Sequence, residues 1–255
     1  MTALSYTPYS SRRVTLPVMT DLSLNDALDA AAFALVGERC RHAHLHDIRG
    51  ELQTLQSSLE LLARSARNPT EKIALTEKAT ALARRALANH EKALLEFVNQ
   101  ITPHVEATAA VDVREMVNGA LRFLRNEAAN KSITFNVEAA ADLRILAQPY
   151  RSRLLMLGLF AMTIDELDNG AEVTVTLRRA DSDVLIEIQS DVVWPAVRSP
   201  EDLWSSATSE VPLRELLLAV TSRWASANGG RVEPPQESPS RPALRLYYPR
   251  DVSRS

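Results

Sequence analysis

Reactive side chains cluster in one short segment of this 255-residue chain, Cys40–Leu52, which contains His42, His44 and His46. On a helix, residues two apart project about 200° away from each other, so the three histidines do not converge on one metal ion. His42 and His46 have the spacing of a metal-binding pair, but the sequence offers no third or fourth ligand near them. We therefore expect no metal site here.

His46 is followed directly by Asp47. A neutral imidazole is a nucleophile towards phosphorus, and a neighbouring carboxylate can fix its tautomer or take up its proton. His46 comes one residue after an apolar seam, so we expect it at the flank of a helix bundle, within reach of another protein's catalytic pocket. The same pair also fits an ordinary surface histidine beside a surface aspartate.

The elements that must position His46 are helical. An apolar heptad pattern, with spacings of three and four, predicts a long helix that needs a partner along its length; it comprises Leu45, Ile48, Leu52, Leu55, Leu59 and Leu62. Asn68–Glu71 ends this helix and starts a second, which makes a hairpin. Because one hairpin leaves its apolar stripe wet, we expect a homodimeric four-helix bundle. The alternative is a hairpin packed on its own C-terminal domain. Residues 22–36 are also predicted helical, either separated at Gly37 or continuous with the main helix.

The pattern changes near residue 105, from Ala- and Leu-rich helices to short β-branched runs. We expect an α+β chain: a flexible tail at 1–21, a helical dimerisation and phosphotransfer domain at 22–104, a linker at 105–112, and an α/β sandwich at 113–255. The sandwich should order its elements as helix 113–129, strands 133–138 and 143–147, helix 150–166, strands 173–177 and 184–188, helix 213–227 and strand 243–248.

The segment His46–Leu52 resembles the H-box of histidine kinases, in which a phosphoaccepting histidine is followed by an acid and then an apolar and a basic residue. The resemblance extends over about residues 40–248, because the later half is similar in element order to that family's ATP-binding domain. It implies that His46 is the phosphoacceptor and Asp47 its orienter or proton acceptor. It also implies a surface for a response-regulator receiver domain, which we assign to His42, Arg49, Gln53 and Gln56.

The chain departs from the family where the family binds ATP. Met162 stands where an asparagine should hold Mg²⁺, and a thioether is a poor ligand for that ion. Asp191 is followed by Val192 and Trp194 where glycines should be, and no Gly-x-Gly occurs in the chain. We therefore expect no bound cofactor, with Mg²⁺ supplied by the partner receiver. Gly50, four residues after His46, implies weak or absent phosphatase activity.

These observations predict a protein similar to ATP-independent dimeric histidine phosphotransferases, which passes a phosphoryl group between receiver domains. Two alternatives remain: a non-catalytic adaptor that sequesters a response regulator or a kinase, and a kinase with an unusual nucleotide site. The net charge of -3 gives no footprint for nucleic acid, and no apolar run reaches the ~18 residues that span a bilayer. The single cysteine, Cys40, fits a cytoplasmic location.

Overall fold

The computed structural model describes residues 13–15, 24–67, 69–101, 107–198, 202, 210–233 and 242–251. Within these ranges only the backbone is described at 13–15, 24–28, 40, 42, 43, 46, 47, 93, 96–101 and 210. The chain divides into two compact units: one consists of residues 1–36 and 104–255, and the other of residues 37–103.

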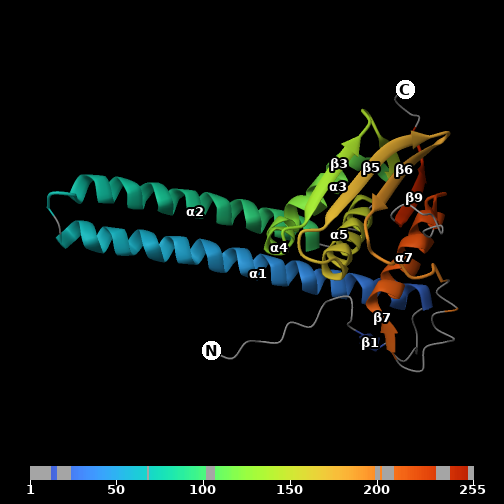
Figure 1. Ribbon diagram of the computed structural model, residues 1–255, viewed down its shortest axis with the longest axis horizontal. Coiled ribbons are helices and arrows are strands. Elements are labelled where there is room, and N and C mark those ends of the chain that lie inside the picture. Colours follow the sequence, from blue (N-terminus) through green and yellow to red (C-terminus); the bar gives the residue numbers. More distant parts are fainter. Residues whose placement is uncertain are drawn as a thin grey trace. The chain divides into compact units, whose positions relative to one another are not determined.

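The first helix, α1 (Leu24–Arg67), contributes to both units, because it runs through Gly37 without a break. Its later part and α2 (Lys72–Ile101) form an antiparallel hairpin, closed by a turn at residues 69–71 (Figure 1). The side chains buried between the two helices are small or polar and recur every seven residues, as Ser58 and Ser65 on α1 and Ala79 and Ala86 on α2. Asn89 Nδ2 also donates to Glu51 Oε1 across the hairpin at 3.3 Å.

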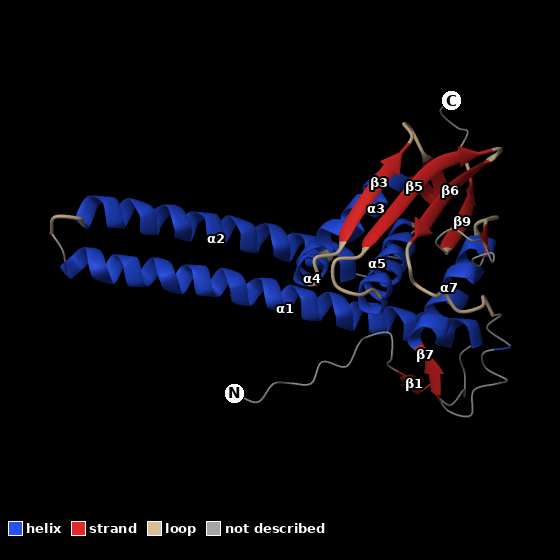
Figure 2. Ribbon diagram, viewed as in Figure 1, coloured by secondary structure: helices blue, strands red, loops and turns tan. Residues whose placement is uncertain are grey.

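The other unit is built on a five-stranded sheet with the order β3-β5-β6-β9-β8, and helices α3, α5 and α7 cover one of its faces (Figure 2). Its strands are β3 (Thr134–Ala139), β5 (Glu172–Ala180), β6 (Asp183–Gln189), β8 (Arg231–Glu233) and β9 (Ala243–Pro249). Only β3 and β5 run parallel, so the sheet is mixed.

Two short antiparallel ribbons complete the strands. In one, β2 (Ala109–Asp112) pairs with β4 (Arg144–Ala147). Half of the segment expected to be a linker is therefore a strand, whose Val111 is buried. In the other ribbon, β1 (Arg13–Thr15) pairs with β7 (Glu210–Pro212), so part of the expected flexible tail is also a strand. Short strands of three or four residues give little sequence signal of their own.

The predicted helix 113–129 divides at Leu124 into α3 (Val113–Phe123) and α4 (Arg125–Asn130). Asp112 caps α3, because its Oδ1 accepts the backbone N–H of Glu115 at 3.0 Å. Beyond α4, Lys131 Nζ donates to the carbonyl oxygens of Ile164, Asp165 and Leu167 at 2.8–3.0 Å. A lysine therefore satisfies the carboxyl end of the next helix, where cations are favoured.

That next helix, α5 (Pro149–Glu166), is the interior helix of this unit. Every residue from Leu154 to Asp165 is buried, because the sheet covers one face and other helices cover the rest. Phe160 packs edge-on against Phe135 of β3, with ring centroids 5.7 Å apart. A helix buried on all sides is apolar all round, which explains the continuous apolar run in its sequence.

The last helix, α7 (Leu213–Ala227), ends where the Asn228–Gly229–Gly230 signal predicted. Gly229 adopts a left-handed φ of 73°, which glycine tolerates best. A side chain on Gly230 would overlap the carbonyl oxygen of Tyr247 on β9. The glycine pair therefore lets the chain turn tightly into β8.

The first turns of α1 pack on α5 and α7 within this same unit. Asp29 is buried and accepts hydrogen bonds from Arg223 Nη1 at 2.8 Å and Trp224 Nε1 at 3.1 Å. Phe33 packs against Trp224 with the rings tilted by 52° and their centroids 5.1 Å apart, and Val36 Cγ2 would lie 3.0 Å from a Cβ at Gly158 of α5. The segment 22–36 was expected in the helical domain, but its described side chains, at residues 29–36, contact the C-terminal elements. Residues 22 and 23 lie outside the described residues.

Candidate functional site

Position 46 lies on the outward face of α1 in the hairpin unit. Residues seven apart on a helix in a bundle share a row, so His46 shares its row with Gln53 and Glu60. Both of those side chains are exposed, whereas the row of Ser58 and Ser65 faces α2. The backbone of residues 46 and 47 is helical, and the side chains of His46 and Asp47 lie outside the described residues.

The residues assigned to receiver binding fall on this row and on the next one. Arg49 and Gln56 share a row with His42, and both are exposed; the side chain of His42 is not described. Gln53 lies one turn after Arg49 and is also exposed. The sequence therefore gathers the assigned residues into one polar strip of two neighbouring rows, which we call the 46–56 strip.

Gly50 leaves a bare patch of backbone beside this strip. It is exposed, and a Cβ added there would have no atom within 4 Å. The hydroxyl of Thr54 donates to the Gly50 carbonyl oxygen at 3.1 Å, one turn further along. Since nothing in the hairpin requires glycine here, the structure allows larger residues at this position.

An apolar stripe borders the same strip. Leu45, Leu52 and Leu59 occupy one heptad row and are exposed, as are Ile73 and Leu87 in the corresponding row of α2. The heptad seam expected from the sequence is therefore only partly used inside one chain. The small side chains close the hairpin, and the large leucines remain on its surface.

The positions that the family resemblance connects with ATP lie around α5. Met162 is buried, and Gly158, one turn before it, lies on the same face of the helix. A Cβ at Gly158 would be 3.0 Å from Val36 Cγ2 and 3.3 Å from Leu217 Cδ2. Side chains from α1 and α7 therefore fill this face of α5 around Gly158.

The loop after β6 is apolar where the family would have glycines. Val192 and Trp194 are buried, and the Val192 N–H donates to Ser190 Oγ at 3.3 Å. Trp194 and Trp224 are both buried in the core of this unit. Residues 203–209, which include Trp204, lie outside the described residues.

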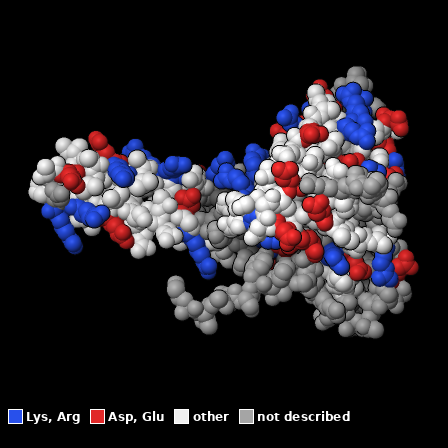
Figure 3. All heavy atoms as spheres, in the orientation of Figure 1, with Lys and Arg blue, Asp and Glu red and all other residues white. Residues whose placement is uncertain are grey.

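Charged groups of both signs are interspersed over the face shown in Figure 3. The resolved pKa shifts occur in the sheet unit: a hydrogen bond to Glu187 raises the pKa of Arg245, and burial raises the pKa of Tyr248. Within the described residues, no group of three or more His, Cys, Asp or Glu side chains could hold a metal ion. No described helix is long and apolar enough to cross a membrane.

The sequence matches no protein-family model, and no curated protein matches it. Solved structures similar to it include the Acinetobacter baumannii histidine kinase AdeS, at 14% identity and a TM-score of 0.44 over 80% of this chain and 97% of that one. A bacterial phosphotransferase is 18% identical, with a TM-score of 0.43 over 91% of this chain and all of that one. Full-length ShkA in complex with AMPPNP is 18% identical, with a TM-score of 0.47 over 69% of this chain and 39% of that one. At TM-scores below 0.5, none of these similarities decides what this chain binds or does.

A groove lies between β3 and the helices α3 and α4, and no pattern in the sequence indicated it. Its volume is about 630 Å³, and it is lined by Glu115, Asn118, Leu121, Arg122, Arg125, Ala128, Ala129, Ile133, Phe135 and Val137. Ile133, Phe135 and Val137 alternate with polar residues in the sequence. This pattern predicts a strand but does not distinguish an edge strand from a central one. That β3 lies at the edge of its sheet follows only from the strand order.

Proposed function

We propose that this protein is a histidine phosphotransferase of a two-component phosphorelay, which moves a phosphoryl group between receiver domains through His46 without using ATP. The observation that carries the proposal is the position of residue 46 on an exposed row of a long helix, within the polar 46–56 strip. A receiver's aspartyl phosphate must approach in line with the imidazole, and a rigid, exposed helix permits that approach.

The chemistry requires little else from this chain. The unprotonated imidazole nitrogen of His46 attacks phosphorus, the bond between phosphorus and the receiver's aspartate oxygen breaks, and that carboxylate leaves. The Mg²⁺ of the receiver's acidic pocket spreads the charge on the transferring group. Asp47 is the neighbouring carboxylate that takes up or orients the remaining imidazole proton. Return of the phosphoryl group to a second receiver is the reverse of these steps.

We also propose that the protein acts as a homodimer through its exposed leucines. Coiled-coil rows of leucine normally insert between partner side chains, and here α1 and α2 each present such a row to the outside. Contiguous exposed apolar surface of this kind marks an interaction site on a protein. A second hairpin would cover these rows and leave the adjoining 46–56 strip open to receivers.

Independence from ATP is supported by the packing of α5. Met162 offers a thioether in place of a magnesium ligand, and Val36 and Leu217 already occupy the helix face at Gly158. A nucleotide phosphate on this face would have to displace packed apolar side chains.

The adaptor alternative uses the same strip. Arg49, Gln53 and Gln56 are exposed and can bind a receiver surface whether or not His46 accepts a phosphoryl group. Binding without transfer therefore needs no change in the geometry described above.

Transfer of ³²P distinguishes these functions. The wild type, His46→Ala and the control His90→Ala, which changes a half-buried histidine of α2, are incubated with a panel of phosphorylated receiver domains and Mg²⁺, and separately with labelled ATP. We expect acid-labile label on the wild type and on His90→Ala, only with receivers, and none on His46→Ala. A receiver that binds all three proteins equally, with no transfer to any, would establish the adaptor. Label from ATP alone would overturn the ATP-independent proposal.

A further inference from the structure

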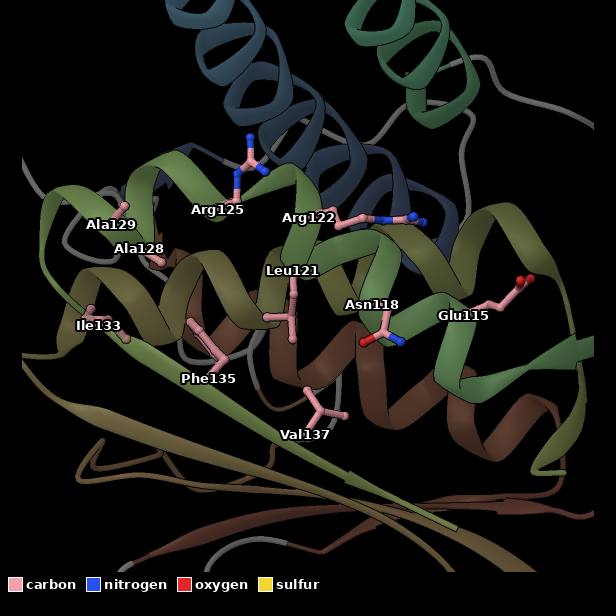
Figure 4. Close-up of a pocket in the computed structure, with 10 residues that line it drawn as sticks. All are labelled: Glu115, Asn118, Leu121, Arg122, Arg125, Ala128, Ala129, Ile133, Phe135 and Val137. Atoms are coloured by element: carbon pink, nitrogen blue, oxygen red, sulfur yellow. The ribbon is translucent and has the colours of Figure 1, made fainter. Parts of the chain in front are cut away.

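The groove beside β3 is formed entirely within the sheet unit. Figure 4 shows Asn118 and Leu121 projecting from α3 towards Phe135 and Val137, which rise from the strand below. Ala128 and Ala129 of α4 lie over its other end, near Ile133. The small side chains of α4 leave open space above the strand, which gives the groove its volume.

One wall of the groove is an unpaired strand edge. On its inner side, β3 pairs with β5: Thr134 N–H donates to Ala171 O at 3.0 Å, and Ala140 N–H donates to Leu177 O at 2.9 Å. In a parallel pair, alternate residues direct both backbone groups to the same side. Phe135 and Val137 therefore present their N–H and C=O groups to the open side. Within the described residues no strand pairs with that side.

The floor of the groove is apolar and only half-buried. Phe135, Val137 and Leu121 each retain partial exposure, in contrast to the fully buried side chains of α5. Phe135 is held in place by its edge-on contact with Phe160. Because this apolar floor is fixed in place and partly exposed to solvent, apolar side chains of a bound segment can pack against it without rearrangement.

The rim adds positive charge at one side. Arg122 and Arg125 are exposed, and neither guanidinium group forms an ion pair or hydrogen bond with a described residue. Glu115 lies at the opposite end of the groove, at the start of α3 (Figure 4). Figure 4 shows both side chains projecting from the side of the helices that faces away from Phe135 and Val137. Two guanidinium groups there favour carboxylates, which arginine binds in a fork-like geometry.

We propose that this groove binds an extended peptide segment of a partner protein, which adds a strand along β3. Its apolar side chains, at alternate positions, would enter the groove over Phe135 and Val137. Acidic side chains beyond one end of the added strand would meet Arg122 and Arg125 on the outer side of the helices. Backbone hydrogen bonds give affinity in strand addition, and the pockets for alternate side chains give selectivity. The inference does not depend on transfer through His46.

Fluorescence anisotropy tests the site directly. The probes are fluorescein-labelled nonapeptides that alternate valine with threonine and end in two aspartates or, as the charge control, in two lysines. The full chain is compared with Val137→Pro, which removes an outward N–H and no hydrogen bond to β5. A second variant joins Arg122→Glu with Arg125→Glu. The control is Arg114→Glu, which changes an exposed arginine of α3 outside the groove.

We expect the acidic peptide to bind the wild type and Arg114→Glu alike, and to bind the other two variants roughly tenfold or more weakly. Hydrogen exchange should show new protection of the Phe135 and Val137 amides when the peptide is present. The double arginine variant keeps the test valid if Val137→Pro fails to fold.

Three outcomes would overturn the proposal. The first is no binding of the acidic peptide by wild type at about 1 mM, the weak end of specific affinity. The second is binding without protection of the two amides, or with equal affinity for the lysine peptide, which would mean a non-specific or small-anion site. The third is a lower molecular mass in solution for Val137→Pro than for the wild type when no peptide is present. That result would mean that the β3 edge pairs with a second copy of this chain.

Discussion

Replacing Leu52 and Leu59 with glutamine should separate the proposed dimer into monomers. In one chain Leu52 is 58% exposed and Leu59 is 65% exposed, so most of each side chain is available for burial by a partner. Full burial of a leucine contributes about 1.5–3 kcal/mol, so covering the exposed part contributes roughly 1–2 kcal/mol. Two leucines in each of two copies then contribute about 4–8 kcal/mol to association.

That loss raises the dissociation constant by roughly a thousandfold or more. Sedimentation velocity over a range of protein concentrations measures the change. Glutamine is a good helix former, so the helix itself should persist, and circular dichroism checks this point. Ser57→Gln with Arg64→Gln is the matched control, because both residues are exposed on a different heptad row of α1.

Two results would refute this reasoning. If the leucine variant sediments as a dimer at the same concentrations as the wild type, the stripe is not the dimer face. If the wild type is a monomer throughout the range, the homodimer itself is wrong. A control variant that also dissociates would show that general helix damage, and not lost burial, is responsible.

Three further changes have defined outcomes. Gly50→Ala should raise the free energy of unfolding by about 0.5–1 kcal/mol, because a mid-helix glycine with open space around it costs backbone entropy. If denaturant titration gives a lower free energy of unfolding for the variant than for the wild type, the glycine has a structural role. Asp29→Ala should lower the free energy of unfolding by about 2–4 kcal/mol, because Arg223 and Trp224 both lose their buried hydrogen-bond acceptor. An unchanged denaturation midpoint would contradict this pairing. Burial raises the pKa of Tyr248, so the unfolded chain ionises first and stability should fall as pH rises above about 10. Tyr248→Phe should reduce that alkaline loss, and an identical pH profile in both proteins would show that another group causes it.

Long, periodic elements were predictable from the sequence. The hairpin, the interior helix α5, the strand pair β5–β6 and the glycine end of α7 each span several turns or a clear turn signal, so local pattern and tertiary packing agree on them. The chain is α+β, as expected, and its larger unit has a mixed sheet with helices on one face.

What the sequence could not supply depends on contacts between distant residues. The segment of β2 was predicted as part of a linker, and it is a strand because it pairs with β4. The start of α1 reads as part of the hairpin, and it packs with α7 because Asp29 finds Arg223 almost two hundred residues away. The division of α1 into small and large heptad rows likewise became visible only when α2 was in place.

For the candidate site, the sequence located His46 on a helix and assigned its neighbours to one strip. The structure adds that Arg49, Gln53 and Gln56 are exposed there. The roles of His46 and Asp47 remain predictions for the transfer experiment.

The small side chains that close the hairpin have a consequence for how this unit forms. Ser58, Ser65, Ala79 and Ala86 bury little apolar area, so a single hairpin gains little free energy from closing. If the leucines are covered by a second copy, most of the burial that holds the hairpin arrives only in the encounter of two chains. The thermal stability of this unit would then rise with protein concentration. A newly synthesised chain would then complete the folding of its hairpin only when the concentration of other copies is high enough for two chains to associate.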